Sequence, residues 1–295
     1  IESKKMEGTF DNVHYLDVNK LNIFDKPIDY MIINRCIHYF EYFPNIKPKK
    51  IYLWVHDPCI NYIYDGKPIS DTYGCEYINN HIKYIDNIIC LSDFQINNLL
   101  SLYNKSIEYK LLLIPHGINI TNCEIIEPEN NKIIKNSFIH VSEPGRSLKN
   151  LLDCFEIIQR DMPDVSLTIF RKSEIDPICL DKINNLQNIT LYDRVSPEIL
   201  INYYIEADIF FFPTDIGESF CLSALEAQLY NCVCVYSDKG ALSTTIGDRG
   251  LKLKKNTLDN NFIEHSSKQI IDLLKNNEKK EFYRKMGNEW ARKQS

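Results

Sequence analysis

Two glutamates separated by seven residues, Glu218 and Glu226, are the side chains of this 295-residue sequence whose spacing most clearly suggests chemistry. An apolar run at 208–213 precedes them, and another at 232–236 follows them. A strand, a loop with one acid, a helix with a second acid and a further strand form one βαβ unit, and ligands bind at the carboxyl ends of the strands in such sheets. Because eight helical residues would separate the carboxylates by about 12 Å, we expect Glu218 in the loop and Glu226 inside the helix. Each acid would then meet a different part of one elongated ligand.

Two basic side chains lie at an earlier strand end. Arg146 and Lys149 follow the apolar run 137–142 and stand at the start of a helix predicted over 147–161. The N–H groups and the dipole of a helix N-terminus favour an anion, and arginine can hold a phosphate through two parallel hydrogen bonds. These residues therefore indicate phosphate binding, most clearly for Arg146; the alternative is that both are solvated cations at a helix start.

The elements that must position these side chains alternate between strand and helix, with short connections, which predicts a parallel α/β sheet in the second half of the chain. We predict its strands at 137–142, 165–171, 188–193, 208–213, 232–237 and 250–254. We predict its helices at 147–161, 175–186, 196–206, 219–230, 240–247, 260–276 and 278–294. The first half is less regular, with strands predicted at 30–33, 51–55, 88–91 and 111–114.

The order and spacing of these segments resemble those of the retaining family 4 glycosyltransferases, also called glycosyl transferases group 1, over about residues 137–290. The basic loop 142–150, the segment 188–198 and the two glutamates match the family in sequence order, and 237–241 stands where the family often has paired glycines. The resemblance implies an α/β fold of two Rossmann-like domains that face a cleft, the arrangement called GT-B.

The resemblance also implies a division into domains. We expect an N-terminal, acceptor-side domain over 1–122, a linker over 123–136 and a donor-binding domain over 137–277. A helix over 278–295 is expected to cross back to the N-terminal domain. The family opens with a strand and a glycine-rich loop, which nothing here fits, so the N-terminal domain is expected to be short or truncated.

In the family, the acid that matches Glu218 holds sugar hydroxyls of the donor. Backbone N–H groups of Ser219, Phe220 and Cys221 would face the distal phosphate, although the family usually has glycines near Ser219 and Cys221. The alternative for Glu218 is a capping charge at a helix N-terminus, which contributes under about 1 kcal/mol.

The resemblance assigns ribose hydroxyls to Glu226 and the neighbourhood of the base to Arg194 and Val195. A buried carboxylate needs partners, so the alternative for Glu226 is a structural hydrogen bond to neighbouring backbone. His56, directly after a predicted strand, resembles a family histidine near the reacting sugar, and an ordinary histidine at a strand end is an equal alternative.

These assignments predict transfer of a hexose-type sugar from a UDP- or GDP-sugar to the hydroxyl of a glycan, lipid or protein acceptor. The resemblance implies retention of anomeric configuration. Neither a metal nor a cofactor is expected, because Arg146, Lys149 and a helix N-terminus can stabilise the leaving diphosphate. Two alternatives keep the fold: a nucleotide-sugar-binding protein without transferase activity, and a sugar-nucleotide epimerase.

Composition and missing motifs exclude other classes. The sequence has no Asp-x-Asp, no phosphate-loop motif and no Gly-x-Gly-x-x-Gly, which argues against metal-dependent transferases of the other main fold, P-loop enzymes and ordinary dehydrogenases. The net charge of −6, without a basic block, argues against nucleic acid as a partner. No apolar run is long enough to span a membrane, and peripheral membrane contact stays open.

Ten scattered cysteines without a Cys-x-x-Cys pair indicate free thiols in a reducing compartment, so we expect a cytoplasmic protein without a zinc site. Abundant Ile, Asn and Lys are typical of an A/T-rich genome, such as that of a large DNA virus or a parasite. A viral origin would place the protein in the host cytoplasm.

Overall fold

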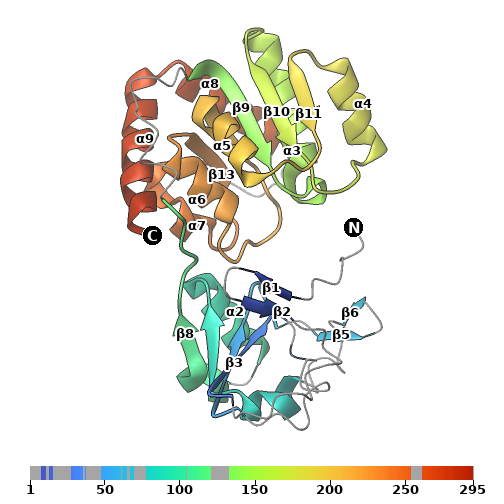
Figure 1. Ribbon diagram of the computed structural model, residues 1–295. Helices are drawn as coiled ribbons and strands as arrows, with labels where there is room; N and C mark the ends of the chain where they lie inside the picture. Colours follow the sequence, from blue (N-terminus) through green and yellow to red (C-terminus); the bar gives the residue numbers. More distant parts are fainter. Residues whose placement is uncertain are drawn as a thin grey trace. The chain divides into compact units, whose positions relative to one another are not determined.

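A computed structural model describes residues 8–10, 13–15, 28–35, 37, 48–60, 62–64, 67–69, 78–103, 105–120, 133–253 and 261–294. The chain divides into two compact units, Ile1–Ile114 and Pro115–Ser295 (Figure 1). Most of the predicted linker lies outside the described residues, as does much of the segment in which a glycine-rich loop was sought. The predicted domain boundaries and the crossing of the last helix to the N-terminal domain stay predictions.

The second unit contains a six-stranded, all-parallel sheet with the order β11-β10-β9-β12-β13-β14. Numbered along this unit, the order is 3-2-1-4-5-6, which is the Rossmann order. The strands are β9 (Ile134–Val141), β10 (Ser166–Phe170), β11 (Ile189–Tyr192), β12 (Ala207–Phe212), β13 (Val233–Ser237) and β14 (Leu251–Leu253).

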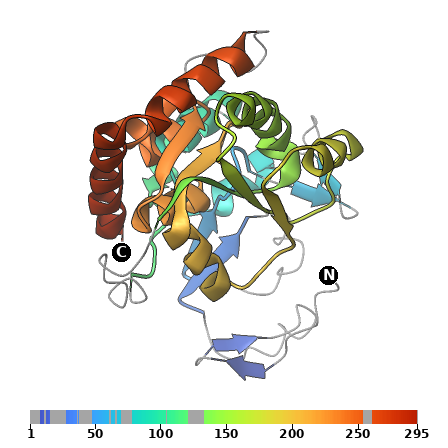
Figure 2. The same ribbon diagram turned by 90° about the horizontal axis from the view of Figure 1, so that it is seen from above.

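Helices flank both faces of this sheet (Figures 1 and 2). They are α3 (Pro144–Asp161), α4 (Pro177–Asn185), α5 (Pro197–Glu206), α6 (Leu222–Leu229), α7 (Leu242–Thr245), α8 (Phe262–Leu274) and α9 (Asn277–Ala291). Helices α3, α4 and α8 share one apolar core with the sheet, whereas α9 packs against α6, α8 and β13.

Local sequence explains why these elements form. Every residue of β12 is buried, and its nearly continuous apolar run is typical of a central parallel strand covered on both faces. Leu148, Leu151, Leu152 and Phe155 recur at helical spacing on α3 and are all buried in the core. Helices α3, α4 and α5 each begin at a proline, whose fixed φ and missing N–H suit the first helical position.

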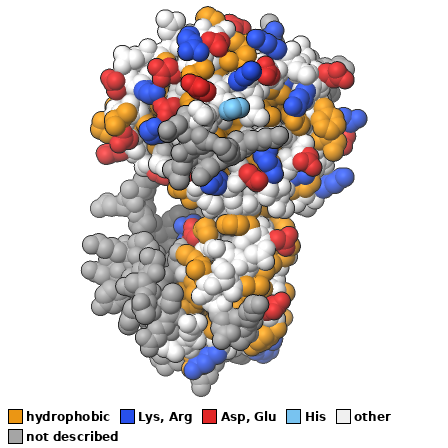
Figure 3. Space-filling model, turned by 180° about the vertical axis from the view of Figure 1, so that it is seen from behind, with side chains coloured by type: hydrophobic (Ala, Val, Ile, Leu, Met, Phe, Trp, Pro, Cys, Tyr) orange, Lys and Arg blue, Asp and Glu red, His pale blue; other side chains and the backbone are white. Residues whose placement is uncertain are grey.

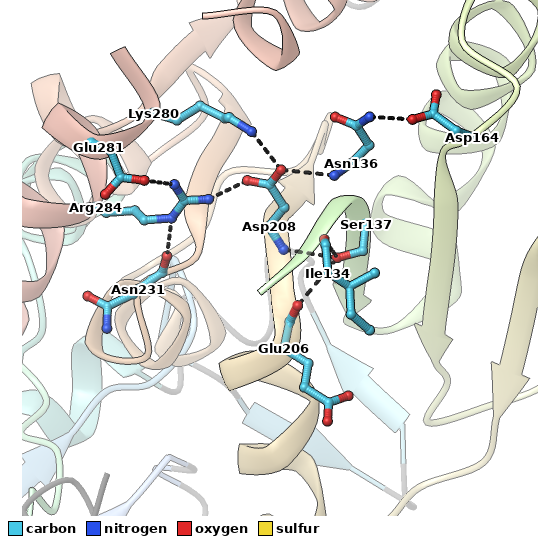
Figure 4. Close-up of polar contacts among 10 residues, drawn as sticks. All are labelled: Ile134, Asn136, Ser137, Asp164, Glu206, Asp208, Asn231, Lys280, Glu281 and Arg284. Carbon is cyan, nitrogen blue, oxygen red and sulfur yellow. Dashed lines mark hydrogen bonds and ion pairs between the residues drawn. The ribbon is translucent and has the colours of Figure 1, made fainter. Parts of the chain in front are cut away.

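One charged residue interrupts the apolar run of β12. Asp208, with a side chain 1% exposed, accepts from Nζ of Lys280 at 2.7 Å and from the backbone N–H of Asn136 at 3.0 Å, and pairs with Arg284 (Figure 4). A buried carboxylate is costly unless it is paired and hydrogen-bonded, and Asp208 meets both conditions. Because Lys280 and Arg284 belong to α9, this cluster fastens α9 to the amino end of β12.

The first unit contains a four-stranded parallel sheet with the order β3-β4-β7-β8. Its strands are β3 (Tyr30–Asn34), β4 (Lys50–Trp54), β7 (Asn87–Cys90) and β8 (Leu111–Leu113), and its helices include α2 (Asp93–Leu102). Two antiparallel hairpins, β1 (Gly8–Phe10) with β2 (Val13–Tyr15) and β5 (Tyr62–Tyr64) with β6 (Lys67–Ile69), complete its described strands. Ser92 caps α2 by accepting from the N–H of Gln95 at 3.2 Å.

All ten predicted strands and all seven predicted helices are confirmed, with shifted ends. Two of the differences concern the helices that follow β12 and β13. The helix predicted over 219–230 begins only at Leu222, and the helix predicted over 240–247 consists of the four residues of α7 followed by a 3-10 turn at 247–249.

No helix in the described ranges is both long enough and apolar enough to cross a lipid bilayer. Acidic and basic side chains are intermixed over the coloured part of the face shown in Figure 3. All seven cysteines of the described residues for which a state is given are free thiols: Cys59, Cys90, Cys154, Cys179, Cys221, Cys232 and Cys234.

Candidate functional site

The site lies where the strand order of the second unit reverses, between β9 and β12. The helices that follow these adjacent strands leave the sheet on opposite sides, which opens a crevice at the carboxyl ends where ligands bind in such folds. Arg146, in the first turn of α3, reaches Glu218, in the loop after β12. Nη1 of Arg146 lies 2.6 Å from Oε1 of Glu218. The structure thus brings together two residues that the sequence predicts as separate ligand contacts.

Buried hydroxyl groups connect the start of α3 with the loop after β12. Thr214, which is fully buried, donates from Oγ1 to the carbonyl of Arg146 at 3.2 Å. Ser237, at the end of β13, donates in turn to the carbonyl of Thr214. This chain of contacts runs from α3 through the β12 loop to β13, so the position of the Arg146 backbone depends on Thr214.

The start of α3 has a second anchor, inside the sheet. His140 on β9 is 1% exposed, and its Nδ1 lies 3.1 Å from the carbonyl oxygen of Phe211. Because a carbonyl only accepts, Nδ1 donates, and Nε2 is left to accept from the hydroxyl of Ser147 at 3.4 Å. Burial lowers the pKa of His140 to about 4, with the hydrogen bond to Phe211 acting in the opposite direction. This histidine is therefore neutral at pH 7.

The backbone of Glu218 is held by the turn after β13. The N–H of Ala241 donates to the carbonyl of Glu218 at 2.7 Å. Gly240 has φ +63°, and a Cβ there would lie 2.4 Å from the carbonyl oxygen of Glu218. Only glycine tolerates both that φ and that approach without strain. A glycine is therefore required in the segment where the resembled family often has a pair of them.

The residues between Glu218 and α6 form a tight, mostly buried turn. Ser219 and Phe220 are each 6% exposed, and Thr245 donates to the carbonyl of Phe220. Cys221 is the N-cap of α6 and has φ +74°, a left-handed conformation that favours glycine. This conformation explains why α6 begins three residues later than the sequence predicts.

A pocket of about 690 Å³ next to α6 contains three of the predicted residues, Arg194, Val195 and Glu226. Its volume lies within the range of about 300–1,000 Å³ that is usual for small-molecule sites. Basic and aromatic side chains that the sequence did not single out line it as well: Phe170, Arg171, Lys172, Tyr204 and Tyr230.

Glu226 is half-buried in this pocket against Tyr204, whose hydroxyl donates to Oε2 of Glu226 at 3.3 Å. Burial raises the pKa of Glu226, whereas the hydrogen bond from Tyr204 and the charge of Lys172 both lower it. The partner of Glu226 is thus a side chain and not the neighbouring backbone that the sequence left open as an alternative.

A second pocket, of about 600 Å³, lies between the starts of α3 and α4. Arg146, Lys149, Glu174 and Asp215 are among its lining residues. Lys149 is 72% exposed and pairs with Asp153 one turn further along α3, at 2.8 Å. Lys149 therefore shares a pocket with Arg146 but is paired to a different acid.

His56 belongs to the first unit and lies two residues after the end of β4. The side chain of Gln95, itself fully buried, donates to the carbonyls of Val55 and Asp57 at 3.1 and 2.6 Å, which fixes the backbone on both sides of His56. The imidazole ring lies 5.1 Å from the Trp54 ring. Burial lowers the pKa of His56, the nearby Arg35 lowers it further and Asp57 opposes them. Its role near a reacting sugar stays a prediction.

Metal ligands do not gather in the part of the chain that the structure covers: no group of three or more His, Cys, Asp or Glu there could hold an ion. The expectation that neither a metal nor a cofactor is needed stays a prediction.

The chain belongs to the glycosyl transferases group 1 family, whose sequence model matches residues 125–291. No curated protein sequence matches the chain.

Solved structures match in fold at low sequence identity. The chain is similar to the pneumococcal O-GlcNAc transferase GtfA in complex with UDP and GlcNAc (TM-score 0.71, 16% identity, 94% of this chain and 55% of that one). It is similar to a mutant of S. aureus TarM in complex with fondaparinux, alpha-GlcNAc-glycerol and UDP (TM-score 0.65, 17% identity, 87% of this chain and 51% of that one). It is also similar to sucrose-phosphate synthase from Thermosynechococcus elongatus (TM-score 0.66, 16% identity, 90% of this chain and 69% of that one).

These likenesses confirm the expected fold class, an α/β fold of the GT-B type with two Rossmann-like units. The chain spans about half the length of the TarM and GtfA chains that it matches.

Proposed function

We propose that the protein transfers a sugar from a nucleotide-sugar donor to an acceptor hydroxyl, with retention of configuration and without a metal ion. The observation that carries the proposal is the meeting of Arg146 and Glu218 at the switch point of a Rossmann-type sheet, in a member of the glycosyl transferases group 1 family. One residue suits an anion and the other suits hydroxyl groups, and a nucleotide sugar offers both.

In this proposal, the donor lies along the carboxyl edge of the second unit. The base lies beside Arg194 and Val195, and the ribose hydroxyls donate to Glu226. Backbone N–H groups of the turn 219–221 and the guanidinium of Arg146 meet the diphosphate. Lys149 adds positive charge from the neighbouring pocket, and Glu218 accepts hydrogen bonds from the sugar.

The pairing of Arg146 with Glu218 suggests how these two charges balance each other before a donor binds. When a donor binds, its phosphate takes over the guanidinium and its sugar hydroxyls take over the carboxylate, so neither charge loses its partner. Arg146 then stabilises the charge that develops on the leaving diphosphate.

The bond from the anomeric carbon to the phosphate oxygen breaks, and a bond to the acceptor oxygen forms on the same face. The acceptor proton passes to the departing phosphate oxygen. His56, from the first unit, is proposed to act near the reacting sugar.

UDP is the first nucleotide to test, because the GtfA and TarM structures that the chain resembles are complexes with UDP. The acceptor is proposed to be a glycan, a lipid or a protein. We propose that the protein acts in the cytoplasm, which would be the host cytoplasm if the protein is viral.

Calorimetric titration with UDP, GDP and their common sugar conjugates, with and without magnesium, tests the proposal. We expect one nucleotide to bind without magnesium, and Glu226→Ala to weaken it at least tenfold. Glu289→Ala is the matched control, because Glu289 is exposed on α9, outside the pocket. Turnover is then sought with candidate acceptors and the sugar conjugate that binds.

The outcomes separate the alternatives. Binding without turnover in the presence of acceptors supports a nucleotide-sugar-binding protein. Conversion of the donor without any acceptor supports an epimerase. Failure of every nucleotide to bind would contradict the proposal.

A further inference from the structure

The pocket beside α6 contains a hydrogen bond that neither the sequence nor the family match assigns. Tyr204, on α5, is 1% exposed and donates to Oε2 of Glu226 at 3.3 Å. Glu226 is half-buried, and its carboxylate is the only one that lines this pocket among the described residues. A carboxylate in such a place must be oriented before it can select the hydroxyl groups of a ligand.

Tyr204 is built to hold its hydroxyl in one place. Its ring is stacked on that of Tyr230, with centroids 6.2 Å apart and an interplanar angle of 15°, and lies 6.5 Å from the ring of Phe210. Its carbonyl accepts from the thiol of Cys232 at 3.0 Å. The ring and the backbone of Tyr204 are thus both restrained, as expected for a side chain that supports a binding residue.

The proton of Tyr204 is available at every physiological pH. Burial, and then the nearby Glu226, raises the pKa of Tyr204 well above its usual value. The hydroxyl is therefore a permanent donor, and it favours the acceptor form of Glu226, the carboxylate.

Titratable groups on several elements lie near Glu226. Tyr204 contributes from α5 and Lys172 from the segment after β10. Arg194 lines the pocket from the turn after β11, and Cys221 lies at the start of the helix that carries Glu226. Lys172 is exposed, so its charge acts through solvent and is the weaker influence.

We propose that Tyr204 is a positioning residue, whose hydroxyl orients Glu226 and keeps it a hydrogen-bond acceptor for the hydroxyl groups of the ligand. Lys172 supports the same state by its charge. The ligand chemistry is that of a vicinal diol, such as the ribose of the donor; this part rests on the proposed function.

The test is a pH titration of the Glu226 side chain in protein with labelled glutamate. NMR monitors the signal of its carboxyl carbon, and Glu226→Gln identifies which signal belongs to Glu226. Tyr204→Phe removes one oxygen and keeps the ring, so we expect the midpoint to rise by roughly 0.5 to 1 pH unit. Lys172→Gln is expected to raise it by less. Tyr203→Phe is the matched control, because Tyr203 adjoins Tyr204 but does not line the pocket, and it should leave the midpoint unchanged.

A parallel titration measures the affinity for UDP, or for whichever nucleotide binds, against pH. The affinity should fall as Glu226 becomes protonated, and in Tyr204→Phe that fall should occur at higher pH. A general loosening of the fold would weaken binding equally at all pH values. If Tyr204→Phe leaves the carboxyl midpoint where it is in the unmodified protein, the proposal is overturned. If the midpoint rises but no nucleotide binds, the positioning role stands and the proposed function fails.

Discussion

The guanidinium of Arg146 and the carboxylate of Glu218 lie 2.6 Å apart, although 72 positions separate them in the chain. The Glu218 side chain is 9% exposed and that of Arg146 43%. Removal of the arginine leaves a nearly buried carboxylate without its charge partner. We expect Arg146→Ala to lower the free energy of unfolding by roughly 1–3 kcal/mol, measured by urea titration, and to weaken nucleotide binding about tenfold or more.

The double variant Arg146→Ala/Glu218→Ala should recover part of this stability and none of the binding. Arg160→Ala is the control on the same helix, because Arg160 pairs with Asp161 only at the surface and should change stability by under about 0.5 kcal/mol. Equal losses in Arg146→Ala and in the double variant would contradict the cost that we assign to the unpaired Glu218 carboxylate.

Gly240 is the second point at which the geometry of Glu218 can be tested. A methyl group at 240 would overlap the backbone of Glu218, so Gly240→Ala should lower the unfolding free energy by at least roughly 1–3 kcal/mol and impair nucleotide binding. Gly145→Ala is the matched substitution, because a Cβ there meets nothing within 4 Å. Gly145→Ala should raise the stability by up to about 1 kcal/mol. Thermal unfolding measures both variants. Equal effects at the two sites would contradict the close approach of Gly240 to the Glu218 backbone.

At position 221 we expect glycine to give a more stable protein than alanine, the reverse of the usual order of stability. Both Cys221→Ala and Cys221→Gly remove the thiol, but only glycine relieves the left-handed backbone at φ +74°. The glycine variant should therefore be more stable than the alanine variant by roughly 1 kcal/mol, measured in parallel denaturant titrations. A more stable alanine variant would show that position 221 is not held in this conformation.

His140 makes stability depend on pH. Its pKa is about 4 in the folded protein and about 6.5 in an unfolded chain. The unfolded state binds the proton first, so the contribution is complete above pH 6.5 and is lost as the pH falls toward 4. Between pH 7 and pH 5 this histidine should account for a loss of about 2 kcal/mol. His140→Asn, which does not titrate there, should lose correspondingly less over the same interval; an identical pH dependence would contradict the neutral, buried histidine.

The charged cluster at the amino end of β12 should matter for folding and not for the ligand. Asp208→Asn removes the carboxylate that Lys280 pairs with in the interior, whereas Arg284 keeps its ion pair with Glu281. We therefore expect a loss of roughly 3–5 kcal/mol, mainly from the buried Lys280. Asp238→Asn breaks an exposed pair with Lys252 and should cost under about 1 kcal/mol. Urea titration measures the loss of unfolding free energy in both variants. Similar values for the two variants would mean that the buried pair is no stronger than a surface one.

Strand and helix positions could be predicted from sequence because they follow from periodicity and from proline, which marks the starts of α3, α4 and α5. The order of motifs also identified the family, and Arg194, Val195 and Glu226 do line one pocket. The late start of α6 could not be predicted, because the left-handed backbone of Cys221 results from tertiary contacts in a residue without special propensity for it.

Tyr204, Lys172 and Thr214 were missed for a related reason. Tyr204 is one of two adjacent tyrosines on a helix, and nothing in the sequence says which of them faces Glu226. Thr214 follows Pro213 in a loop, where a hydroxyl is ordinary. Their importance depends on which loops adjoin, and only the strand order 3-2-1-4-5-6 fixes that.

Strand β12 joins two regions that are stabilised by separate sets of contacts. Its amino end carries Asp208 and the buried attachment of α9, while its carboxyl end leads through Thr214 to Glu218. Substitutions around Glu218 leave the charges at the first end untouched. The attachment of α9 can therefore persist while the residues around Glu218 change, and any stability lost there is expected to be local.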